Sequence, residues 1–391
     1  MTGPTQRRSA AIVGIGHTNY VQDYADVRAG KVRTDSNGYA VEAFNAALAD
    51  AGITRDEVDG LIVGAPIVYE RAGEILGLNV RWGDSADAVS AIVKAVIAIE
   101  TGAADVVALI YGNNQRSAGT QYGGPQAMGG DAFLSYVYHN PWGLTSQGAL
   151  YGLLYQKYIT ERGYDPLMLG HVAVAERHWA SLNPDALMRK TITHEDYARA
   201  QFICEPLRLL DYCLVNDGGV ALILTSAERA SRSAQQPVFI DGIGRFDLNV
   251  GATSLEPRVD GFYQSAQHKA GQASYDTAGY GPQDMDVFSV YDSFSVHVPL
   301  AFEGYGYCAP GEVEKLFHEQ GIGPGGKIPT NTGGGHLSES YMQGWGHQIE
   351  LVRQLRGHAG DRQIAGAKRG HYTSDVAGKA FSIIYSSEQG S

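Results

Sequence analysis

The segment Ala11-Ile12-Val13-Gly14-Ile15-Gly16 recurs in the second half of the chain as Phe239-Ile240-Asp241-Gly242-Ile243-Gly244. A second pair follows at nearly the same offset. The strand-like segments Gly60-Leu61-Ile62-Val63-Gly64 and Val287-Phe288-Ser289-Val290-Tyr291 lie about 227 positions apart. Two matches in the same order and at the same spacing favour a duplicated α/β unit. The alternative is coincidence, because a strand followed by glycine is common in α/β proteins.

Composition restricts the class of protein. A chain of 391 residues exceeds what one compact core usually holds, so we expect two domains or two fused halves. The 42 acidic and 30 basic residues give a net charge of −12, which disfavours nucleic acid or an anionic membrane surface as a partner. No apolar run reaches the roughly 18 residues of a membrane span. Three cysteines cannot form a disulfide framework, so we expect a cytoplasmic protein.

Helical periodicity and buried strands alternate along the first half. Apolar residues recur at helical spacing over 39–51 and again over 85–101, where Gly102 ends the pattern. Residues 105–111 form a continuous apolar strand, which is typical of a parallel sheet covered by helices on both faces. This alternation predicts a layered α/β fold.

A segment of different composition interrupts the first half. We place the N-terminal half at 1–237 and the C-terminal half at 238–391, with an inserted loop domain at about 113–205 laid over the first half. The insertion has a glycine-rich loop at 119–130 and then aromatic residues, namely Phe133, Tyr136, Tyr138, Trp142, Tyr151, Tyr155 and Tyr158. Aromatic side chains with polar tips suit the wall of an apolar ligand pocket or a protein interface. A small core of the loop domain itself is the alternative.

Several common site motifs are incomplete or absent. Gly14-x-Gly16 lacks the third glycine of a dinucleotide fingerprint, and 321–327 lacks the spacing and hydroxyl residue of a phosphate loop. The 12 histidines show no tight metal-ligand spacing, and no Gly-x-Ser-x-Gly elbow is present, so we expect no metal site. The distinctive stretch is 331–347, where Gly334 and Gly335 let backbone N–H groups approach a ligand oxygen. A packed turn is the alternative there.

The strongest family signal lies in Pro206-Leu207-Arg208-Leu209-Leu210-Asp211-Tyr212-Cys213 and in Asn216-Asp217-Gly218-Gly219-Val220-Ala221. These segments resemble the region that closes the first half of sterol-carrier-type thiolases. Over nearly its whole length the chain is similar to the thiolase superfamily, specifically to its lipid-transfer-protein branch. The resemblance implies a duplicated αβαβα five-layered sandwich, which agrees with the repeat.

The chain departs from the thiolase pattern at the positions that carry the chemistry. Counted back from Gly102, the nucleophilic cysteine position falls on Ser85, and residues 355–391 contain no cysteine. Tyr291 replaces the Asn or His of the family's Asn-Glu-Ala-Phe motif, and Tyr341 replaces the His of its Gly-His-Pro motif. Thiolysis requires a thiolate, so we expect no thiolase activity. Ser85 is either a helix N-cap or a replacement nucleophile with no base apparent in the sequence.

Two tyrosines at these positions resemble the steroid side-chain-cleaving aldolases of the superfamily. That resemblance implies retro-aldol cleavage of a β-hydroxyacyl-CoA steroid to a 17-ketosteroid and propionyl-CoA, with no cofactor besides the CoA of the substrate. Cleavage requires a base for the β-hydroxyl proton and an acid for the thioester enolate. A phenol has a pKa of about 10, so a base role requires neighbouring dipoles or a lowered pKa. We predict that Tyr291 and Tyr341 share the two transfers, with support from His336, His297, Gly334 and Gly335.

Two other classes of protein remain as alternatives. In the first, the chain is a non-catalytic lipid or acyl-CoA carrier, and in the second it is an inert structural subunit. In both, Tyr291 and Tyr341 are packing residues. For the aldolase, the resemblance further implies a steroid acyl-CoA substrate, a homodimer core, and an OB-fold partner with a zinc ribbon. It also implies that these chains together form a heterotetramer.

Overall fold

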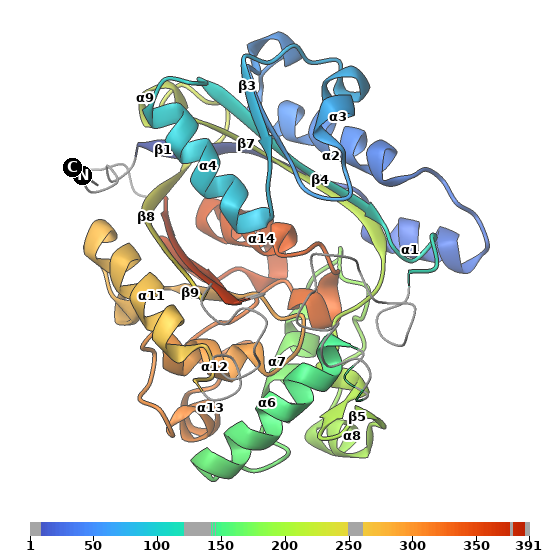
Figure 1. Cartoon of the computed structure of the whole chain (residues 1–391), viewed down its shortest axis with the longest axis vertical. Helices are drawn as coiled ribbons and strands as arrows, with labels where there is room; N and C mark the ends of the chain where they lie inside the picture. The colour runs from blue at the N-terminus through green and yellow to red at the C-terminus, as the bar shows by residue number, and fades with distance from the viewer. Residues whose placement is uncertain are drawn as a thin grey trace.

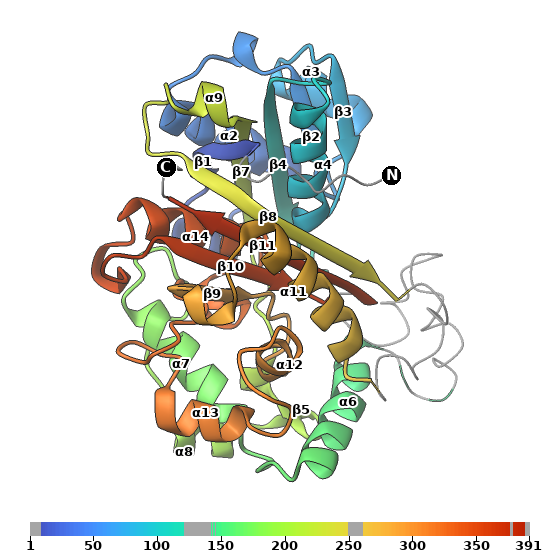
Figure 2. The same ribbon diagram turned by 90° about the vertical axis from the view of Figure 1, so that its left-hand side faces the viewer.

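One large mixed sheet dominates the computed structural model, which describes residues 9–120, 142, 144, 146–248, 261–375 and 378–387. Its strands are β1 Ala10–His17, β2 Gly60–Val63, β3 Trp82–Ser85, β4 Val106–Asn114, β7 Asp217–Ser226, β8 Val238–Asp247, β9 Val287–Val290, β10 Arg369–Ser374 and β11 Lys379–Ser386. They lie in the order β3-β2-β4-β7-β1-β8-β11-β10-β9. The first half of the chain therefore supplies one end of the sheet and the second half supplies the other (Figure 2).

The two repeated segments meet where the halves of the sheet join. β1 and β8 are antiparallel, with Ala11 opposite Phe239 and Ile12 opposite Val238. β8 begins at Val238, the residue at which the second half is predicted to begin. Because one sheet continues across that boundary, the division into 1–237 and 238–391 stays a prediction.

Helices cover both faces of each half of the sheet. The helix α2, Ser36–Ala51, packs on the outer face of the first half, and α11, Gln264–Ala278, packs on the outer face of the second half. Between the halves lie α4, Ala88–Glu100, and α14, Trp345–Arg356 (Figure 1). Their apolar side chains share one core with strands of both halves. This arrangement confirms the predicted duplicated αβαβα five-layered sandwich.

Capping residues explain where the two predicted helices of the first half begin. α2 begins after Asp35, whose side chain accepts a hydrogen bond from the Gly38 N–H at 3.0 Å, and it ends at Gly52, which has a φ of +68°. α4 begins after Asp87, whose side chain accepts hydrogen bonds from two backbone N–H groups of the first turn. Both helices are confirmed, and the second begins three residues later than the periodicity predicted.

The buried strand predicted at 105–111 does not lie in the purely parallel sheet that its apolar composition indicates. β4 runs parallel to β2 but antiparallel to β7, so the sheet is mixed. Nearly every residue of β4 is nevertheless buried. The cause is the pair of helix layers on its two faces, α2 and α4, which exclude water whatever the direction of the neighbouring strand.

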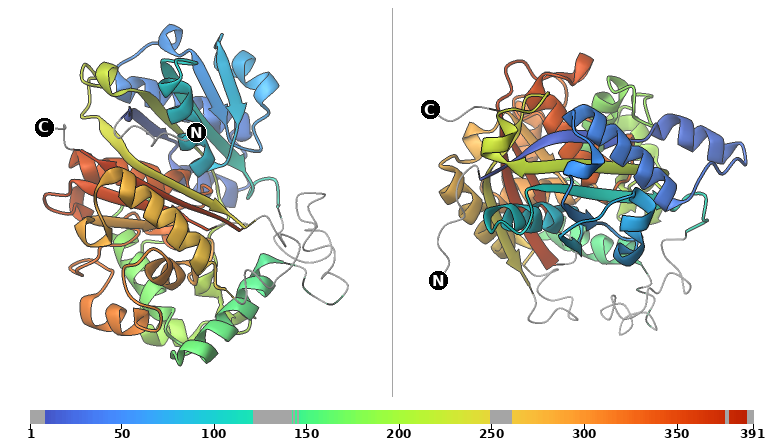
Figure 3. Two further views of the ribbon diagram at one scale, coloured as in Figure 1. Left: turned by 60° about the vertical axis from the view of Figure 1, so that its left-hand side comes forward. Right: turned by 90° about the horizontal axis from the view of Figure 1, so that it is seen from above.

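The insertion packs on the second half rather than on the first. Its strand β5, Phe202–Cys204, pairs with β6, Leu207–Arg208, which follows the insertion. Its helices are α6 Gln147–Arg162, α7 Gly170–Ser181 and α8 His194–Arg199. These helices share a core with α12, His297–Gly304, and α13, Val313–Gln320. In the left view of Figure 3 they lie beside the helices of the second half. The prediction that the insertion lies over the first half is therefore wrong, because its apolar faces match helices that the sequence pattern did not place.

The aromatic residues of the insertion divide into two groups. Tyr151, Tyr155 and Tyr158 are buried in the core shared with the second half, whereas Trp142 is 87% exposed. Phe133, Tyr136, Tyr138 and residues 121–130 of the glycine-rich loop lie outside the described residues.

The remaining α-helices of the described residues are α1 Tyr20–Arg28, α3 Tyr69–Leu76 and α9 Ala227–Ala230. Across the described ranges, every helix falls short of the length and apolar character that a membrane span requires.

Candidate active site

The two tyrosines predicted to be catalytic lie together in the fold. Tyr291 follows the end of β9, and Tyr341 lies between a π-helical turn at Gly335–Glu339 and α14. Their phenol oxygens are 3.1 Å apart, although the residues are 50 positions apart in the sequence. Tyr291 is 7% exposed and Tyr341 is partly buried. The geometry that the two-tyrosine hypothesis requires is therefore present.

Tyr341 is held by the first half of the chain. Its backbone N–H donates to Asn216 Oδ1 at 2.7 Å, and its carbonyl accepts a hydrogen bond from Asn113 Nδ2 at 3.3 Å. Both asparagines are fully buried, so neither bond competes with bulk water. Asn216 lies in the segment that carries the family resemblance. Nothing in the sequence pattern pointed to Asn113, whose contact spans 228 positions.

Burial raises the pKa of both phenols well above the ordinary value of 10. Loss of hydration disfavours the charged phenolate, and in a buried site this effect is large. The lowered pKa that a phenolate base requires is therefore not present, and both phenols are protonated at neutral pH. This favours proton donation as the role of the pair.

Asp292 is the buried anion of the site. Its carboxylate accepts hydrogen bonds from the backbone N–H groups of His336 at 2.8 Å and Leu337 at 3.3 Å, and from His347 Nε2 at 2.7 Å. Burial acts to raise the pKa of Asp292. The His347 and His336 side chains outweigh burial and hold that pKa below its ordinary value of 3.8. The ionised carboxylate thus fixes the start of the turn that leads to Tyr341.

Two glycines allow close packing around this anion. A Cβ on Gly335 would lie 2.3 Å from Asp292 Oδ2 and 2.7 Å from Glu176 Oε2, and the backbone φ there is +59°. Gly334 has a φ of +105°, which only glycine adopts readily. Burial and then the Asp292 charge raise the pKa of Glu176, so this carboxyl is protonated. The N–H groups that reach a carboxylate oxygen belong to the two residues after these glycines. Substrate contacts of Gly334 and Gly335 stay a prediction.

The two predicted supporting histidines lie close to the Tyr291 ring. The ring centroids of His336 and His297 are 4.7 and 6.0 Å from that of Tyr291. His336 Nε2 accepts a hydrogen bond from the Gly344 N–H at 2.9 Å, so in the neutral ring the proton is on Nδ1. His297 Nε2 lies 3.1 Å from Ser293 Oγ. The fold therefore brings both histidines to the site, and it gives each a different partner.

Asp292, His336 and His347 also form a group of the kind that binds metals. One ligand atom of each lies within 4.8 Å of the others, and two imidazoles with a carboxylate suit a divalent transition metal. Only the fold brings these positions together, so no spacing in the sequence pointed to them. His347 Nε2 and the backbone N–H of His336 are hydrogen-bonded to Asp292. The expectation of no metal site stays a prediction.

The chain is similar to known enzymes over most of its length. Residues 252–386 match the family described as thiolase C-terminal domain-like. The chain is 34% identical over 369 residues to the 17-hydroxy-3-oxo-4-pregnene-20-carboxyl-CoA lyase of Mycobacterium tuberculosis, covering 89% of this chain and 92% of that one. It is 33% identical over 367 residues to the steroid side-chain-cleaving aldolase of Thermomonospora curvata, covering 89% and 90%. This chain belongs to the steroid side-chain-cleaving aldolases of the thiolase superfamily.

Solved structures agree with this assignment of the aldolase. The structure of the Ltp2-ChsH2(DUF35) aldolase matches with a TM-score of 0.86 and 28% identity over 98% of both chains. Human mitochondrial 3-ketoacyl-CoA thiolase in complex with CoA matches with a TM-score of 0.69 and 15% identity, over 98% of each chain. The second likeness concerns the fold alone.

The residue predicted to occupy the thiolase nucleophile position, Ser85, lies outside any helix in this aldolase. Ser85 is the last residue of β3 and is exposed. Asp87 caps α4 by accepting hydrogen bonds from the Val89 and Ser90 N–H groups, so the N-cap interpretation of Ser85 is wrong. The helix begins at Ala88, and a residue on the preceding strand cannot cap it.

A cysteine that the sequence did not place lies at the site of the aldolase. The Cys213 N–H donates to the Ser293 carbonyl at 3.1 Å. Burial, followed by the Asp292 charge, raises the pKa of the Cys213 thiol to about 12. A thiol with this pKa is protonated at neutral pH and is a poor nucleophile. The position of Cys213 therefore does not restore thiolase chemistry.

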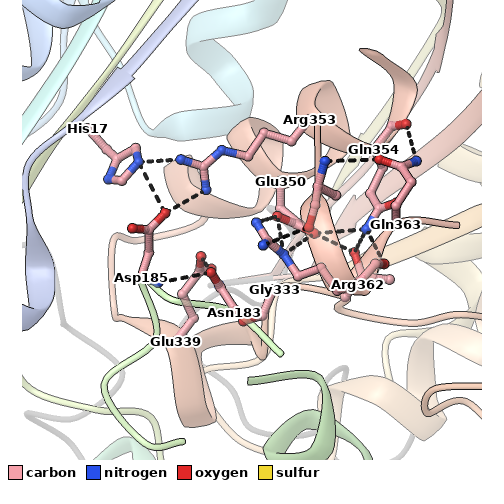
Figure 4. A network of polar contacts seen from close by, with 12 residues as sticks. His17, Asn183, Asp185, Gly333, Glu339, Glu350, Arg353, Gln354, Arg362 and Gln363 are labelled. Atoms are coloured by element: carbon pink, nitrogen blue, oxygen red, sulfur yellow. Dashed lines mark hydrogen bonds and ion pairs between the residues drawn. The ribbon is translucent and has the colours of Figure 1, made fainter. Parts of the chain in front are cut away.

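A buried polar network connects the turn before Tyr341 to the rest of the aldolase (Figure 4). Glu339, at the end of this turn, accepts a hydrogen bond from Asn183 Nδ2 of the insertion at 2.9 Å. Burial and then the Glu350 charge raise the pKa of Glu339 to about 8. Glu350 itself pairs with Arg362 at 2.8 Å. A neighbouring group in the same view joins the first half, the insertion and α14 through His17, Asp185 and Arg353.

Proposed function

We propose that the chain cleaves a steroid side chain by retro-aldol chemistry on a β-hydroxyacyl-CoA thioester. The observation that carries the proposal is the pair of phenols, 3.1 Å apart, at two positions where thiolases hold other catalytic groups. Burying a hydroxyl group costs free energy unless it is hydrogen-bonded. A carrier that only encloses a lipid has no need of two such hydroxyls, because apolar rings would enclose it equally well.

The reaction requires one proton acceptor and one proton donor. The β-hydroxyl loses its proton, the bond between the α- and β-carbons breaks, and the β-carbon becomes a ketone. The electrons of the broken bond form a thioester enolate, whose α-carbon takes up a proton. One protonated phenol supplies that proton, and its hydrogen-bonded neighbour stabilises the phenolate left behind. Burial keeps both phenols in the protonated state that this role requires.

The substrate class rests on the relatives. The relative from Mycobacterium tuberculosis is named for 17-hydroxy-3-oxo-4-pregnene-20-carboxyl-CoA, a steroid with a 17-hydroxyl group and a CoA thioester on C20. We infer a substrate of the same class here. Its cleavage gives a 17-ketosteroid and propionyl-CoA, and the CoA leaves with the acyl product, so no separate cofactor is required.

The test is turnover of a tertiary β-hydroxyacyl-CoA steroid, with mass spectrometry of the ketone and the shorter acyl-CoA. Tyr291→Phe and Tyr341→Phe should each lower kcat by about 10²- to 10⁴-fold, the range for loss of a general acid. Tyr385→Phe is the matched control, because Tyr385 is also a buried tyrosine whose hydroxyl donates to a side chain, Gln348 Oε1, at 2.9 Å. Near-wild-type turnover in both tyrosine variants would end the assignment, and binding without products would favour the carrier.

We further propose that the aldolase works as a homodimer core with a DUF35-type partner, as the name of the Ltp2-ChsH2(DUF35) complex suggests. Co-expression with such a partner should give a particle of two copies of each chain by analytical ultracentrifugation. It should also raise turnover above that of the chain alone. Equal turnover with and without the partner would contradict the proposal.

A further inference from the structure

A line of three hydrogen-bonding side chains lies beside Tyr291. His297 Nδ1 is 2.6 Å from Asp375 Oδ1, and His297 Nε2 is 3.1 Å from Ser293 Oγ. All three residues are buried, with exposed fractions of 0% for His297, 3% for Asp375 and 5% for Ser293. Asp375 follows β10, Ser293 follows β9 and His297 begins α12, so three separate elements set the geometry.

The partners fix the direction in which protons move along this line. Asp375 Oδ2 accepts a hydrogen bond from Gln267 Nε2 at 2.9 Å, so the carboxylate is an acceptor on both of its oxygens. His297 Nδ1–H therefore donates to Asp375, and the lone pair on Nε2 faces the Ser293 hydroxyl. An imidazole held by a carboxylate on one side and facing a hydroxyl on the other is the arrangement that activates a hydroxyl group in serine hydrolases.

Two other imidazole nitrogens of the site already have hydrogen-bond partners. His336 Nε2 is occupied by the Gly344 N–H, and His347 Nε2 is bonded to Asp292. Both phenols are protonated because burial raises their pKa values. Among the described histidines around the tyrosine pair, His297 thus keeps a lone pair directed at a hydroxyl.

We propose that Ser293, His297 and Asp375 form the relay that accepts the β-hydroxyl proton in the retro-aldol step. This proposal rests on the proposed function and supplies the base that the two phenols cannot provide. Ser293 is the group that touches the substrate, and His297 and Asp375 act through it. No nucleophilic attack by Ser293 is involved.

The step balances without a further reactant. The substrate O–H bond breaks as its proton passes to Ser293 Oγ, and the Ser293 proton passes to His297 Nε2. The bond between the α- and β-carbons then breaks to give the ketone and the thioester enolate. A phenol protonates the α-carbon, and the His297 imidazolium returns its proton to the phenolate through the site. The Asp375 carboxylate stabilises the imidazolium while it exists.

A second buried serine–histidine pair has no carboxylate on its imidazole and serves as a comparison for the relay. His371 Nε2 lies 2.7 Å from Ser382 Oγ, but its Nδ1 lies 3.0 Å from the Tyr307 hydroxyl instead of a carboxylate. Burial lowers the pKa of His371 to about 3, so this imidazole cannot hold a proton at neutral pH. The Asp375 carboxylate is the feature that distinguishes the relay from this pair.

The groups facing the relay come from several elements. Tyr151 of α6 packs on the His297 ring at 4.5 Å between centroids, and Tyr291 lies at 6.0 Å. Two further titratable groups lie within electrostatic reach of the relay. They are His336, in the π-helical turn Gly335–Glu339, and Tyr305, directly after α12. The neighbouring tyrosines stay neutral over pH 5 to 9 and do not contribute a limb there. Asp211 and Glu339, whose pKa values are raised to about 6 and about 8, also titrate in this range, so only a shift of the limb in Asp375→Asn is read as coming from the relay.

The test is the pH dependence of kcat in the complex that turns over. Wild type should lose activity on the acid side, because a relay that already holds a proton cannot accept one from the substrate. Asp375→Asn should lower the maximal kcat by about 10²-fold or more, because the protonated relay loses the anion that stabilises it. For the same reason, the fall of kcat on the acid side should move to lower pH. Ser293→Ala should lower kcat by a similar factor, with KM nearly unchanged. The matched control, Ser382→Ala, should leave both the maximal kcat and its fall on the acid side in place.

The outcomes separate the relay from the proposed function. If wild type turns over and Asp375→Asn and Ser293→Ala keep its rate and its acid limb, the relay is wrong while the aldolase assignment stands. If wild type itself forms no ketone, the proposed function fails first. Nitrogen-15 NMR of the wild-type His297 ring gives a reading independent of activity. The Nδ1–H tautomer is expected, and the Nε2–H tautomer would overturn the proposal.

Discussion

Replacing Asp292 with asparagine should strongly destabilise the fold around the tyrosine pair. The Asp292 carboxylate is fully buried and accepts hydrogen bonds from the His336 and Leu337 N–H groups and from His347 Nε2. In Asp292→Asn the negative charge is lost. One acceptor oxygen also becomes an NH₂ group, which cannot accept from any of these donors.

The magnitude follows from the number and the kind of bonds. A hydrogen bond to a charged group contributes roughly 1.5–3 kcal/mol, and breaking a buried ion pair costs about 3–5 kcal/mol. Since an Asn oxygen keeps part of the bonding, we expect a loss of about 3–5 kcal/mol in the free energy of unfolding. That is a large part of the roughly 5–15 kcal/mol by which proteins are usually stable.

Urea denaturation between pH 3 and pH 8 measures this effect and its sign. The folded-state pKa of Asp292 is lowered, so its contribution is full above the unfolded value of 3.8 and is lost as pH falls through the lower folded value. Asp292→Asn should therefore be destabilised at pH 7 and should lose less of its remaining stability than wild type on acidification. A loss of less than about 1 kcal/mol at pH 7 would refute the reasoning.

A matched control is Asp211→Asn. Asp211 is also fully buried, and it accepts hydrogen bonds from the Tyr197 hydroxyl at 3.0 Å and the Arg208 N–H at 2.6 Å. Burial raises its pKa to about 6, so its contribution falls as pH rises from about 4 to 6. In Asp211→Asn the free energy of unfolding should change less between about pH 4 and 6 than it does in wild type. Asp292→Asn should show no such difference from wild type in this window.

Three further predictions concern single residues. Gly335→Ala should destabilise by more than about 2 kcal/mol, since its Cβ would meet two carboxyl oxygens; Gly325→Ala, also at positive φ but with open space, should cost only about 1 kcal/mol. Wild type should lose stability as pH rises from about 4.5 to 8, because the folded-state pKa of Glu339 is raised to about 8 and the folded chain binds this proton more tightly than the unfolded chain does. Glu339→Gln should remove that loss, and urea midpoints across this range measure it. Ser85→Ala should keep near-wild-type turnover, and a large loss of rate would revive the nucleophile hypothesis.

The candidate site was only partly visible in the sequence. Tyr291 and Tyr341 were identified because they occupy motif positions at which thiolases hold other groups. Asp292 stands directly beside Tyr291, yet its partner His347 comes from α14, distant in the chain. Asp375, the partner of His297, likewise comes from a distant element and follows β10. Motif comparison assigns a position, but it carries no information on which side chain meets which across a packed core.

The sequence by itself determined the duplicated fold and the likeness to the steroid side-chain-cleaving aldolases. Repeated strand and helix patterns are local, and burial on both faces of a strand is encoded in its apolar composition. Only the tertiary structure decided that the insertion packs on the second half, that Ser85 ends a strand, and that both phenols stay protonated. These features depend on which apolar faces fit together and on how much water the fold removes from each group. Such properties arise from contacts between distant residues and have no signature in any one segment.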